Sequence, residues 1–139
     1  MEQSKDPSPV TDLPLLAAEA PLAAAIAADP AARDRALRAF SALSHGDRLD
    51  LIRLLVPAGS EGIAAGEIAR RLGLSASRLS FHLSQLEQAG LLTARRVARN
   101  VFYAMDPAGL GAAISYLLND CCQDHPEVIA CCQAPQSNE

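Results

Sequence analysis

The chain contains no tryptophan and few other aromatic residues, which limits the folds open to it. Two tyrosines and three phenylalanines are spread over 139 residues, although half of all residues are hydrophobic. Much of that half is alanine, whereas a β-sandwich or barrel core usually relies on larger apolar side chains. The composition therefore favours small-residue, helix-rich packing in one domain with a single modest core.

Long apolar runs and a secretory signal are missing as well. No run approaches the roughly 18 residues that would span a membrane, and Glu2 and Asp6 accompany Lys5 where a signal peptide would be basic. We therefore expect a cytoplasmic protein with no membrane partner. In that reducing compartment, four cysteines indicate metal binding or redox chemistry rather than structural disulfides.

Motifs of the common enzyme classes are also absent. The chain has no glycine-rich phosphate loop, nucleophile elbow, H-E-x-x-H or C-x-x-C. Ser44, His45 and Asp47 stand close together, but they fall in a short turn between two predicted helices. Helix capping by Asp47 explains this cluster better than catalysis does. We therefore expect a binding protein and not an enzyme.

Positive charge is concentrated in one part of a chain whose net charge is −4. Between Gly62 and Met105 six arginines face two glutamates, which gives +4, and the remaining six basic and fourteen acidic residues give −8. A basic island in an acidic chain is typical of a surface that binds nucleic-acid phosphates. The arginines of this island are Arg70, Arg71, Arg78, Arg95, Arg96 and Arg99.

The chain divides into three segments by composition. Residues 1–30 hold five prolines among many alanines, which predicts a flexible N-terminal arm. Residues 31–120 carry regular helix and strand patterns and form the predicted folded domain. Residues 121–139 are acidic, contain all four cysteines and are interrupted by Pro126. We expect them to form a loosely ordered tail that becomes ordered when a ligand binds.

Within residues 31–120 the pattern predicts four helices, a β-hairpin and a last helix. The helices cover Ala31–Leu43, Asp47–Val56, Ala65–Leu72 and Ser75–Ala89, the strands cover Leu91–Arg96 and Val101–Met105, and the last helix opens at Asp106–Pro107. Two short helices joined by Gly73–Leu74 and followed by a hairpin make a winged helix-turn-helix. The predicted fold class is mainly α with a small β-hairpin.

Apolar spacing predicts which helix faces are buried. We expect stripes of Leu49, Ile52, Leu55 and Val56 on the second helix, Leu79, Leu83 and Leu86 on the fourth, and Ile114, Leu117 and Leu118 on the last. An apolar stripe of that size on the last helix indicates a dimer interface, which suits a two-fold symmetric DNA site.

The helix after Ser75 is the predicted DNA-reading element. Its polar side chains and arginine suit base edges and phosphates in a major groove, and three arginines on the hairpin suit the backbone or the minor groove. Two residues have a second interpretation: Phe81 as a partly packed side chain, and His82 as a phosphate contact or structural hydrogen bond rather than a metal ligand. The predicted DNA-binding residues are Ser75, Ser77, Arg78, Ser80, Phe81, His82, Gln85, Arg95, Arg96 and Arg99.

Three segments together resemble the ArsR/SmtB family of arsenical-resistance and metal-responsive repressors. They are Ala-Leu-Ser-His-Gly-Asp-Arg-Leu-Asp-Leu-Ile-Arg-Leu-Leu (Ala42–Leu55), Glu67–Leu72, and the run from Leu79 through Ser-Phe-His-Leu-Ser-Gln-Leu-Glu-Gln-Ala-Gly to Leu92. The resemblance covers about residues 31–118. It implies a homodimer joined by the first and last helices, an inverted-repeat operator, and loss of DNA affinity when an inducer binds.

Two ligand sites found in this family have no counterpart in the chain. In some arsenic sensors of this family, cysteines lie at the start of the helix-turn-helix. The matching stretch here, Ile63–Ala69, has no cysteine. Zinc sensors of the family carry Asp, His and Glu on the last helix, and Pro107–Leu118 contains none of these residues.

The chain instead carries Cys121–Cys122 after the last helix and Cys131–Cys132 further on. Thiolates are soft ligands, and trivalent arsenic, As(III), binds three sulfurs in a pyramid. The arrangement resembles family members whose arsenite site is a cysteine pair plus one further cysteine. We therefore expect As(III), and by similar chemistry Sb(III), as the inducer. The sequence does not choose between Cys131 and Cys132 as the third ligand.

Other interpretations of the cysteines stay open. Four thiolates would also suit zinc, cadmium or lead, with His125 as an extra ligand although we expect it to be solvated. Disulfides between the pairs would make a redox switch, and the cysteines could also have no sensing role. A winged helix that binds only protein is the other functional class, and the arginines of the fourth helix and hairpin disfavour it.

Overall fold

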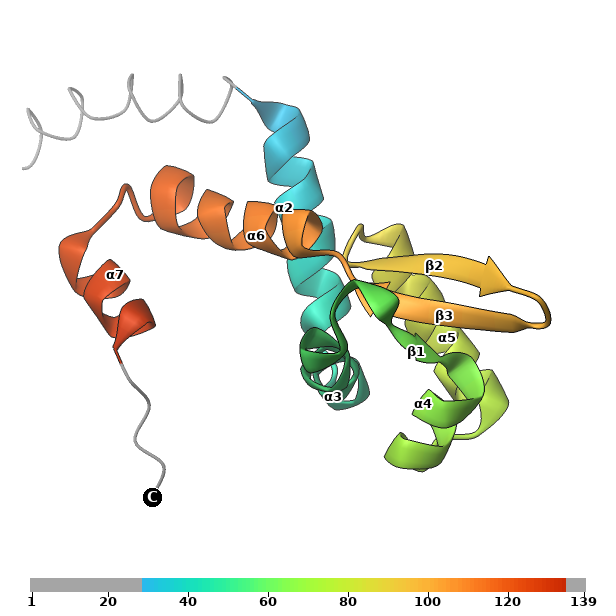
Figure 1. Cartoon of the computed structure of the whole chain (residues 1–139). Coiled ribbons are helices and arrows are strands. Elements are labelled where there is room, and N and C mark those ends of the chain that lie inside the picture. The colour runs from blue at the N-terminus through green and yellow to red at the C-terminus, as the bar shows by residue number, and fades with distance from the viewer. Residues whose placement is uncertain (1–28, 135–139) are drawn as a thin grey trace, which may run out of the picture. The chain divides into compact units, whose positions relative to one another are not determined.

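The computed structural model describes residues 29–134 of the chain (Figure 1). The chain divides into two units, Met1–Arg33 and Asp34–Glu139. The arm predicted for residues 1–30 lies outside the described part apart from its last two residues, so the structure leaves that prediction open.

The described elements follow the predicted order. They are α2 (Pro30–Leu43), α3 (Gly46–Leu55), the 3₁₀ segment η2 (Val56–Glu61), β1 (Ile63–Ala64), α4 (Ala65–Leu72), α5 (Ala76–Gln88), β2 (Leu92–Val97), β3 (Asn100–Met105), α6 (Pro107–Ser115), the π-helical segment η3 (Tyr116–Cys121) and α7 (Pro126–Gln133). The fold is mainly helical with a small antiparallel sheet, and the predicted winged helix-turn-helix is confirmed.

Local sequence explains how α4 and α5 meet. Gly73 ends α4 in the left-handed conformation, with φ of 66°, and Ser75 begins α5 by accepting a hydrogen bond from the backbone N–H of Arg78 at 3.2 Å. Leu79, Leu83 and Leu86 of α5 are buried as predicted. The opposite side of the helix is thereby left for contacts outside the core.

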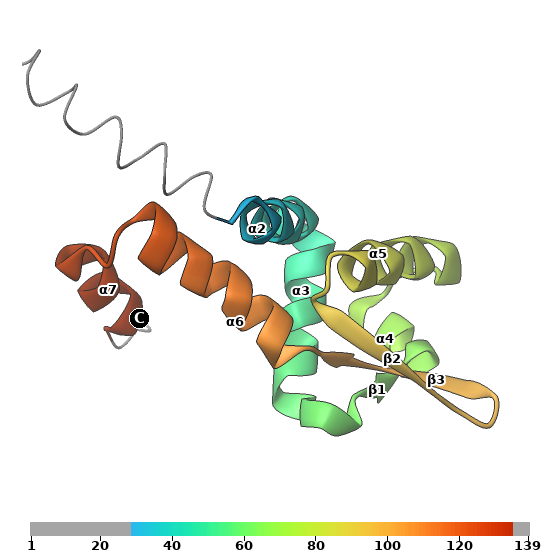
Figure 2. The ribbon, with the colours of Figure 1, turned by 90° about the horizontal axis from the view of Figure 1, so that it is seen from above.

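The sheet has three strands in the order β1–β3–β2, one more than predicted. In the hairpin Leu92 pairs with Met105 and Val97 with Asn100, so the turn between the strands is two residues long. Both views show the hairpin projecting past α4 and α5 (Figure 1 and Figure 2). The third strand, β1, has only two residues, too few to show the alternation by which strands are recognised.

The core joins α3, α4, α5 and the start of the hairpin. Its fully buried side chains are Leu51, Leu55, Ile68, Leu86 and Leu91. The stripe predicted for α3 is wrong in part, because Leu49 and Val56 are exposed while Leu51 lies in the core. The α3 helix thus packs through a face rotated from the one that simple spacing indicated.

The first turn of α6 is held against the end of α5. Asp106 caps α6 by accepting hydrogen bonds from Ala108 N and Gly109 N, and its own N–H donates to Leu91 O at 2.9 Å. A Cβ on Gly109 would overlap the carbonyl oxygen of Gly90. The two backbones therefore meet where only glycine at position 109 lets them approach.

We expect Gly109→Ala to lower the free energy of unfolding by about 2 kcal/mol, because the added methyl must push the Gly90 backbone aside. Gly111→Ala is the matched control, since a Cβ there meets no atom within 4 Å. Alanine in that open helical position should be neutral or stabilising. Urea unfolding of the two variants measures the difference, and equal stabilities would contradict the close approach.

Beyond Ala113, α6 and η3 turn apolar side chains outward. Ala113 is buried, whereas Ile114 and Leu117 are 43% and 41% exposed. No helix in residues 29–134 is long and apolar enough to cross a membrane. An apolar face left open on the described residues is typical of a surface that another protein chain covers.

The prediction of a loosely ordered segment after Cys122 is wrong for residues 126–133, which form α7. Pro126 occupies the first turn of that helix, where a missing N–H costs nothing, so it starts the helix instead of interrupting it. The His125 ring caps the helix by accepting a hydrogen bond from Glu127 N at 3.2 Å. The cysteines of the second pair therefore lie on a helix.

Candidate functional site

Most of the predicted DNA-reading side chains of α5 are exposed. Ser75, Ser77, Arg78 and Ser80 are exposed, and Phe81 is 57% exposed. Phe81 therefore points mainly outward, and its ring centre lies 5.6 Å from that of His82 and 6.0 Å from the guanidinium carbon of Arg48. The hydroxyl of Ser75 also caps α5 by accepting a hydrogen bond from Arg78 N.

Two predicted residues face the protein instead. His82 is 4% exposed and lies 3.1 Å from an arginine nitrogen, so its placement agrees with the predicted structural hydrogen bond and not with a phosphate contact. On a helical wheel of α5, His82 lies between the buried face and the exposed face. Its ring points toward polar groups of α3. Gln85 is half-buried and lines a hollow of about 290 Å³ with α2 residues such as Arg38 and Ser41. Both side chains therefore lie between α5 and its neighbouring helices.

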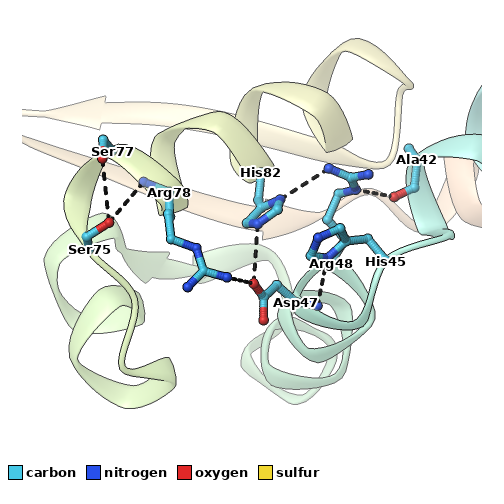
Figure 3. Close-up of polar contacts among 8 residues, drawn as sticks. All are labelled: Ala42, His45, Asp47, Arg48, Ser75, Ser77, Arg78 and His82. Carbon is cyan, nitrogen blue, oxygen red and sulfur yellow. Dashed lines mark hydrogen bonds and ion pairs between the residues drawn. The ribbon is translucent and has the colours of Figure 1, made fainter.

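A polar network between α3 and α5 surrounds His82 (Figure 3). Asp47 Oδ2 accepts a hydrogen bond from Arg78 Nη2 at 2.7 Å and lies 3.3 Å from His82 Nε2. Arg48 Nη1 lies 3.1 Å from His82 Nδ1, and Arg48 Nε donates to Ala42 O at 2.6 Å. The carboxylate of Asp47 thus joins the buried histidine to the exposed arginine of α5.

This network overturns the expected role of Asp47. The cap of α3 is His45, whose Nδ1 accepts a hydrogen bond from Asp47 N at 3.1 Å. The capping geometry leaves the Asp47 side chain free to reach Arg78, which lies 31 residues further along the chain. Sequence reasoning missed Asp47 and Arg48 as site residues, because their partners come from a different helix and no local spacing reveals them.

The contacts of His82 fix its protonation. An arginine N–H can only donate, so Nδ1 accepts from Arg48 and the neutral ring carries its hydrogen on Nε2, facing Asp47. Burial, and then the neighbouring His45 and Arg48, lower the pKa of His82 below its ordinary value of 6.5, although Asp47 opposes them. We therefore assign a neutral His82 at neutral pH.

A lowered histidine pKa makes stability depend on pH in a definite direction. The unfolded chain takes up a proton near pH 6.5 and the folded chain does not, so the unfolding free energy falls as pH drops below about 6.5. We expect His82→Gln to flatten this part of the profile, measured as melting temperature between about pH 7.5 and pH 5.5. Parallel profiles for parent and variant would contradict a neutral His82.

His45, Asp47 and His82 also place potential ligand atoms within 4.8 Å of one another. A cation there would have to displace Arg78 from Asp47, and it would sit beside the Arg48 guanidinium. Both ring nitrogens of His82 already face hydrogen-bond partners. The geometry therefore favours a hydrogen-bond network over a metal centre.

The three arginines of the hairpin differ in their surroundings. Arg95 donates from Nη2 to Glu61 O at 2.8 Å, and its guanidinium carbon lies 5.1 Å from the centre of the Phe102 ring. Arg96 and Arg99 are exposed and make no hydrogen bond or ion pair with another described residue. Arg95 thus ties the hairpin to η2, while the other two are available to phosphates.

Two more arginines of the basic island, Arg70 and Arg71, share the single carboxylate of Glu67 within α4, which balances one of their two charges. Glu67 forms ion pairs with Arg70 and Arg71. The hydrogen bonds from Arg70, which has the larger effect, and from Arg71 lower the pKa of Glu67 from 4.5 to about 2. The unpaired positive charge of the island therefore falls mainly on the hairpin.

All four cysteines lie in the described part of the chain as free thiols. Cys121, Cys131 and Cys132 are exposed and Cys122 is half-buried. Within residues 29–134 they do not bring three sulfurs within 4.8 Å of one another. Cys121 ends η3, and the segment between the pairs holds Gln123 and Asp124 with φ of 55° and 56°. A site that uses both pairs therefore requires a rearrangement of this segment.

Comparisons with known proteins agree with the architecture. A family model described as a helix-turn-helix domain matches residues 43–95. The HTH-type transcriptional regulator YgaV of Escherichia coli (strain K12) is 36% identical over 92 residues, which make up 66% of this chain and 91% of YgaV.

Solved structures extend the agreement to three dimensions. HlyU from Vibrio cholerae N16961 has a TM-score of 0.52 at 32% identity, covering 66% of this chain and 96% of HlyU. A homodimeric winged helix-turn-helix DNA-binding domain from Mycobacterium bovis, described as a possible ArsR-family regulator, has a TM-score of 0.52 at 27% identity, covering 80% of this chain and 92% of that domain.

YgaV and HlyU are transcriptional regulators and not enzymes, and the two solved structures share the fold that places α5 and the hairpin together. The chain therefore belongs to the ArsR-type family of winged helix-turn-helix transcriptional regulators.

Proposed function

We propose that the protein is a dimeric repressor that binds operator DNA through α5 and the hairpin and releases it on binding As(III), or Sb(III), through C-terminal cysteines. The ligands are Cys121, Cys122 and one of Cys131 and Cys132. One observation carries the proposal: two pairs of free thiols flank a short segment directly after the helix that carries the open apolar face.

The chemistry of the donors supports a soft, thiophilic inducer. Each thiol that binds arsenous acid forms one sulfur–arsenic bond and releases one water, so three thiols replace its three hydroxyl groups. Sulfur is the donor that such ions prefer, and no histidine is needed. His125 is engaged in capping α7, which makes it a poorer candidate for a zinc or cadmium ligand.

The backbone around the first pair supports a switch at this point. The hydrogen bonds of the π-helical segment η3 span one residue more than those of an α-helix, a feature frequent at functional sites. Non-glycine residues in the left-handed region are strained by about 1–2 kcal/mol each, and Gln123 and Asp124 are two in succession. Ligation that draws α7 toward Cys121 and Cys122 must change the backbone of this segment.

The apolar face beside the cysteines supports the dimer. Ile114 and Leu117 are exposed on α6 and η3, and the Mycobacterium bovis relative is a homodimer. A two-fold dimer presents two copies of α5 at a fixed spacing to an inverted-repeat operator. Ligand binding at the end of the dimer helix changes that spacing and lowers the affinity for DNA.

A titration of the reduced protein tests the proposal. The probe is a duplex that the protein itself selects from a randomised library, and the ligands are arsenite, antimonite, cadmium, zinc and peroxide. We expect release of the duplex by arsenite and antimonite at lower concentrations than by the others. Release by cadmium or zinc alone, or by peroxide alone, would replace the proposal with a different metal sensor or a redox sensor.

A further inference from the structure

We propose that Asp47 is a specificity-determining residue that orients Arg78 for reading a base, although Asp47 itself lies outside the DNA-reading helix. The inference rests on the proposed role of α5 in DNA reading and is independent of the inducer. The supporting observation is that one carboxylate oxygen of Asp47 contacts both the exposed Arg78 and the buried His82.

The guanidinium of Arg78 uses only one of its three nitrogens in a hydrogen bond to another described residue. Its Nη2 donates to Asp47, while Nε and Nη1 make no hydrogen bond to another described residue, and the side chain is 61% exposed. Guanine presents two acceptors, O6 and N7, to a pair of guanidinium N–H groups in the major groove. A guanidinium held at one nitrogen by a carboxylate keeps the rest of its planar fork available for such a pair.

Asp47 is itself held in place from the protein side. Its side chain is 26% exposed, and its oxygen faces the Nε2–H of a histidine that is 4% exposed. Arg48, anchored on Ala42 O, fixes the other side of that histidine. The chain of contacts from α3 to Arg78 thus starts in the core, which is what a support for a DNA-reading side chain requires.

This role predicts different effects of removing Asp47 on the binding of two kinds of DNA. Asp47 adds a negative charge near the surface that meets phosphates, so its removal should leave binding to unrelated sequences unchanged or stronger. Arg78 without its support samples more rotamers, so binding to the selected duplex should weaken because those rotamers must be ordered again. General unfolding of the protein would instead weaken both kinds of binding together.

The experiment measures the affinity of Asp47→Asn for the self-selected duplex and for a scrambled duplex of the same composition, at several salt concentrations. We expect the ratio of the two affinities to fall about tenfold, within the range of one arginine–guanine pair. Asp50→Asn is the matched control: Asp50 lies on the same helix, is exposed, and makes no hydrogen bond or ion pair with another described residue. It removes the same charge and should keep the ratio.

A double-mutant cycle with Arg78→Ala completes the test. We expect Asp47→Asn to have no further effect on the ratio once Arg78 is absent, because its effect passes through that side chain. An unchanged or raised ratio in Asp47→Asn alone would overturn the inference and show that Asp47 is dispensable or restrains Arg78 from DNA. If Arg78→Ala itself leaves the ratio unchanged, the proposed role of α5 fails instead.

Discussion

Protein carrying Cys121→Ser or Cys122→Ser should bind its DNA as the parent does and keep it bound when arsenite is added. Serine matches cysteine in size but lacks the soft donor, so the fold is preserved while sulfur–arsenic bonds are lost. Driving a repressor from 99% bound to 1% bound requires about 5.5 kcal/mol of preference for the released form. Removing one of three covalent ligands should abolish most of that preference.

The second cysteine pair should divide into one essential and one dispensable residue. Cys131 and Cys132 are adjacent on α7, so their side chains point about 100° apart. Only one of them can face the first pair while the helix persists. Serine substitution at one position should therefore remove induction, and at the other leave it intact.

DNA-release assays and X-ray absorption of the arsenite-bound protein measure these outcomes. Gln133→Ser is the control, because it changes an exposed residue next to Cys132 without touching a thiol. Should all four cysteine variants still release DNA on arsenite addition, the tail is not the sensor.

The second large effect is expected at Arg78. Arg78→Ala should weaken binding to the selected duplex about a hundredfold or more, because a dimer loses one base contact of about 1–3 kcal/mol in each half-site. Binding to scrambled DNA should change much less. Fluorescence anisotropy with both duplexes measures the two affinities.

Arg78→Lys separates the shape of the side chain from its charge. Lysine keeps the positive charge but lacks the planar fork that pairs with guanine, so we expect it to restore non-specific binding and not specificity. Full recovery of specific binding by lysine would mean that Arg78 contacts a phosphate and not a base.

The sequence was sufficient to predict the elements whose signals are local. Gly73 and Ser75 mark the turn and the cap of the helix-turn-helix, and the leucines of α5 mark its buried face. In each case the deciding interaction spans at most a few residues, so it is visible in a single stretch of chain.

The features that sequence reasoning missed depend on partners far along the chain. Asp47 looks like a cap until α5 brings Arg78 and His82 beside it. The rotation of α3 that buries Leu51 and exposes Leu49 is set by packing against other helices. For Pro126 the reason is different: proline is tolerated in the first turn of a helix and interrupts a helix elsewhere, so its effect depends on where the helix begins.

The contact between Gly90 and Gly109 bears on whether the DNA preference and the inducer of such a regulator can be exchanged independently. It fastens the start of α6 to the end of the DNA-reading helix, and within the described chain the buried core stops at Ala113. The part proposed to read DNA and the part that carries the thiols are thus joined at one short stretch of α6. Chimaeras that exchange the sequence after Ser115 should keep the promoter preference of one parent and acquire the inducer of the other.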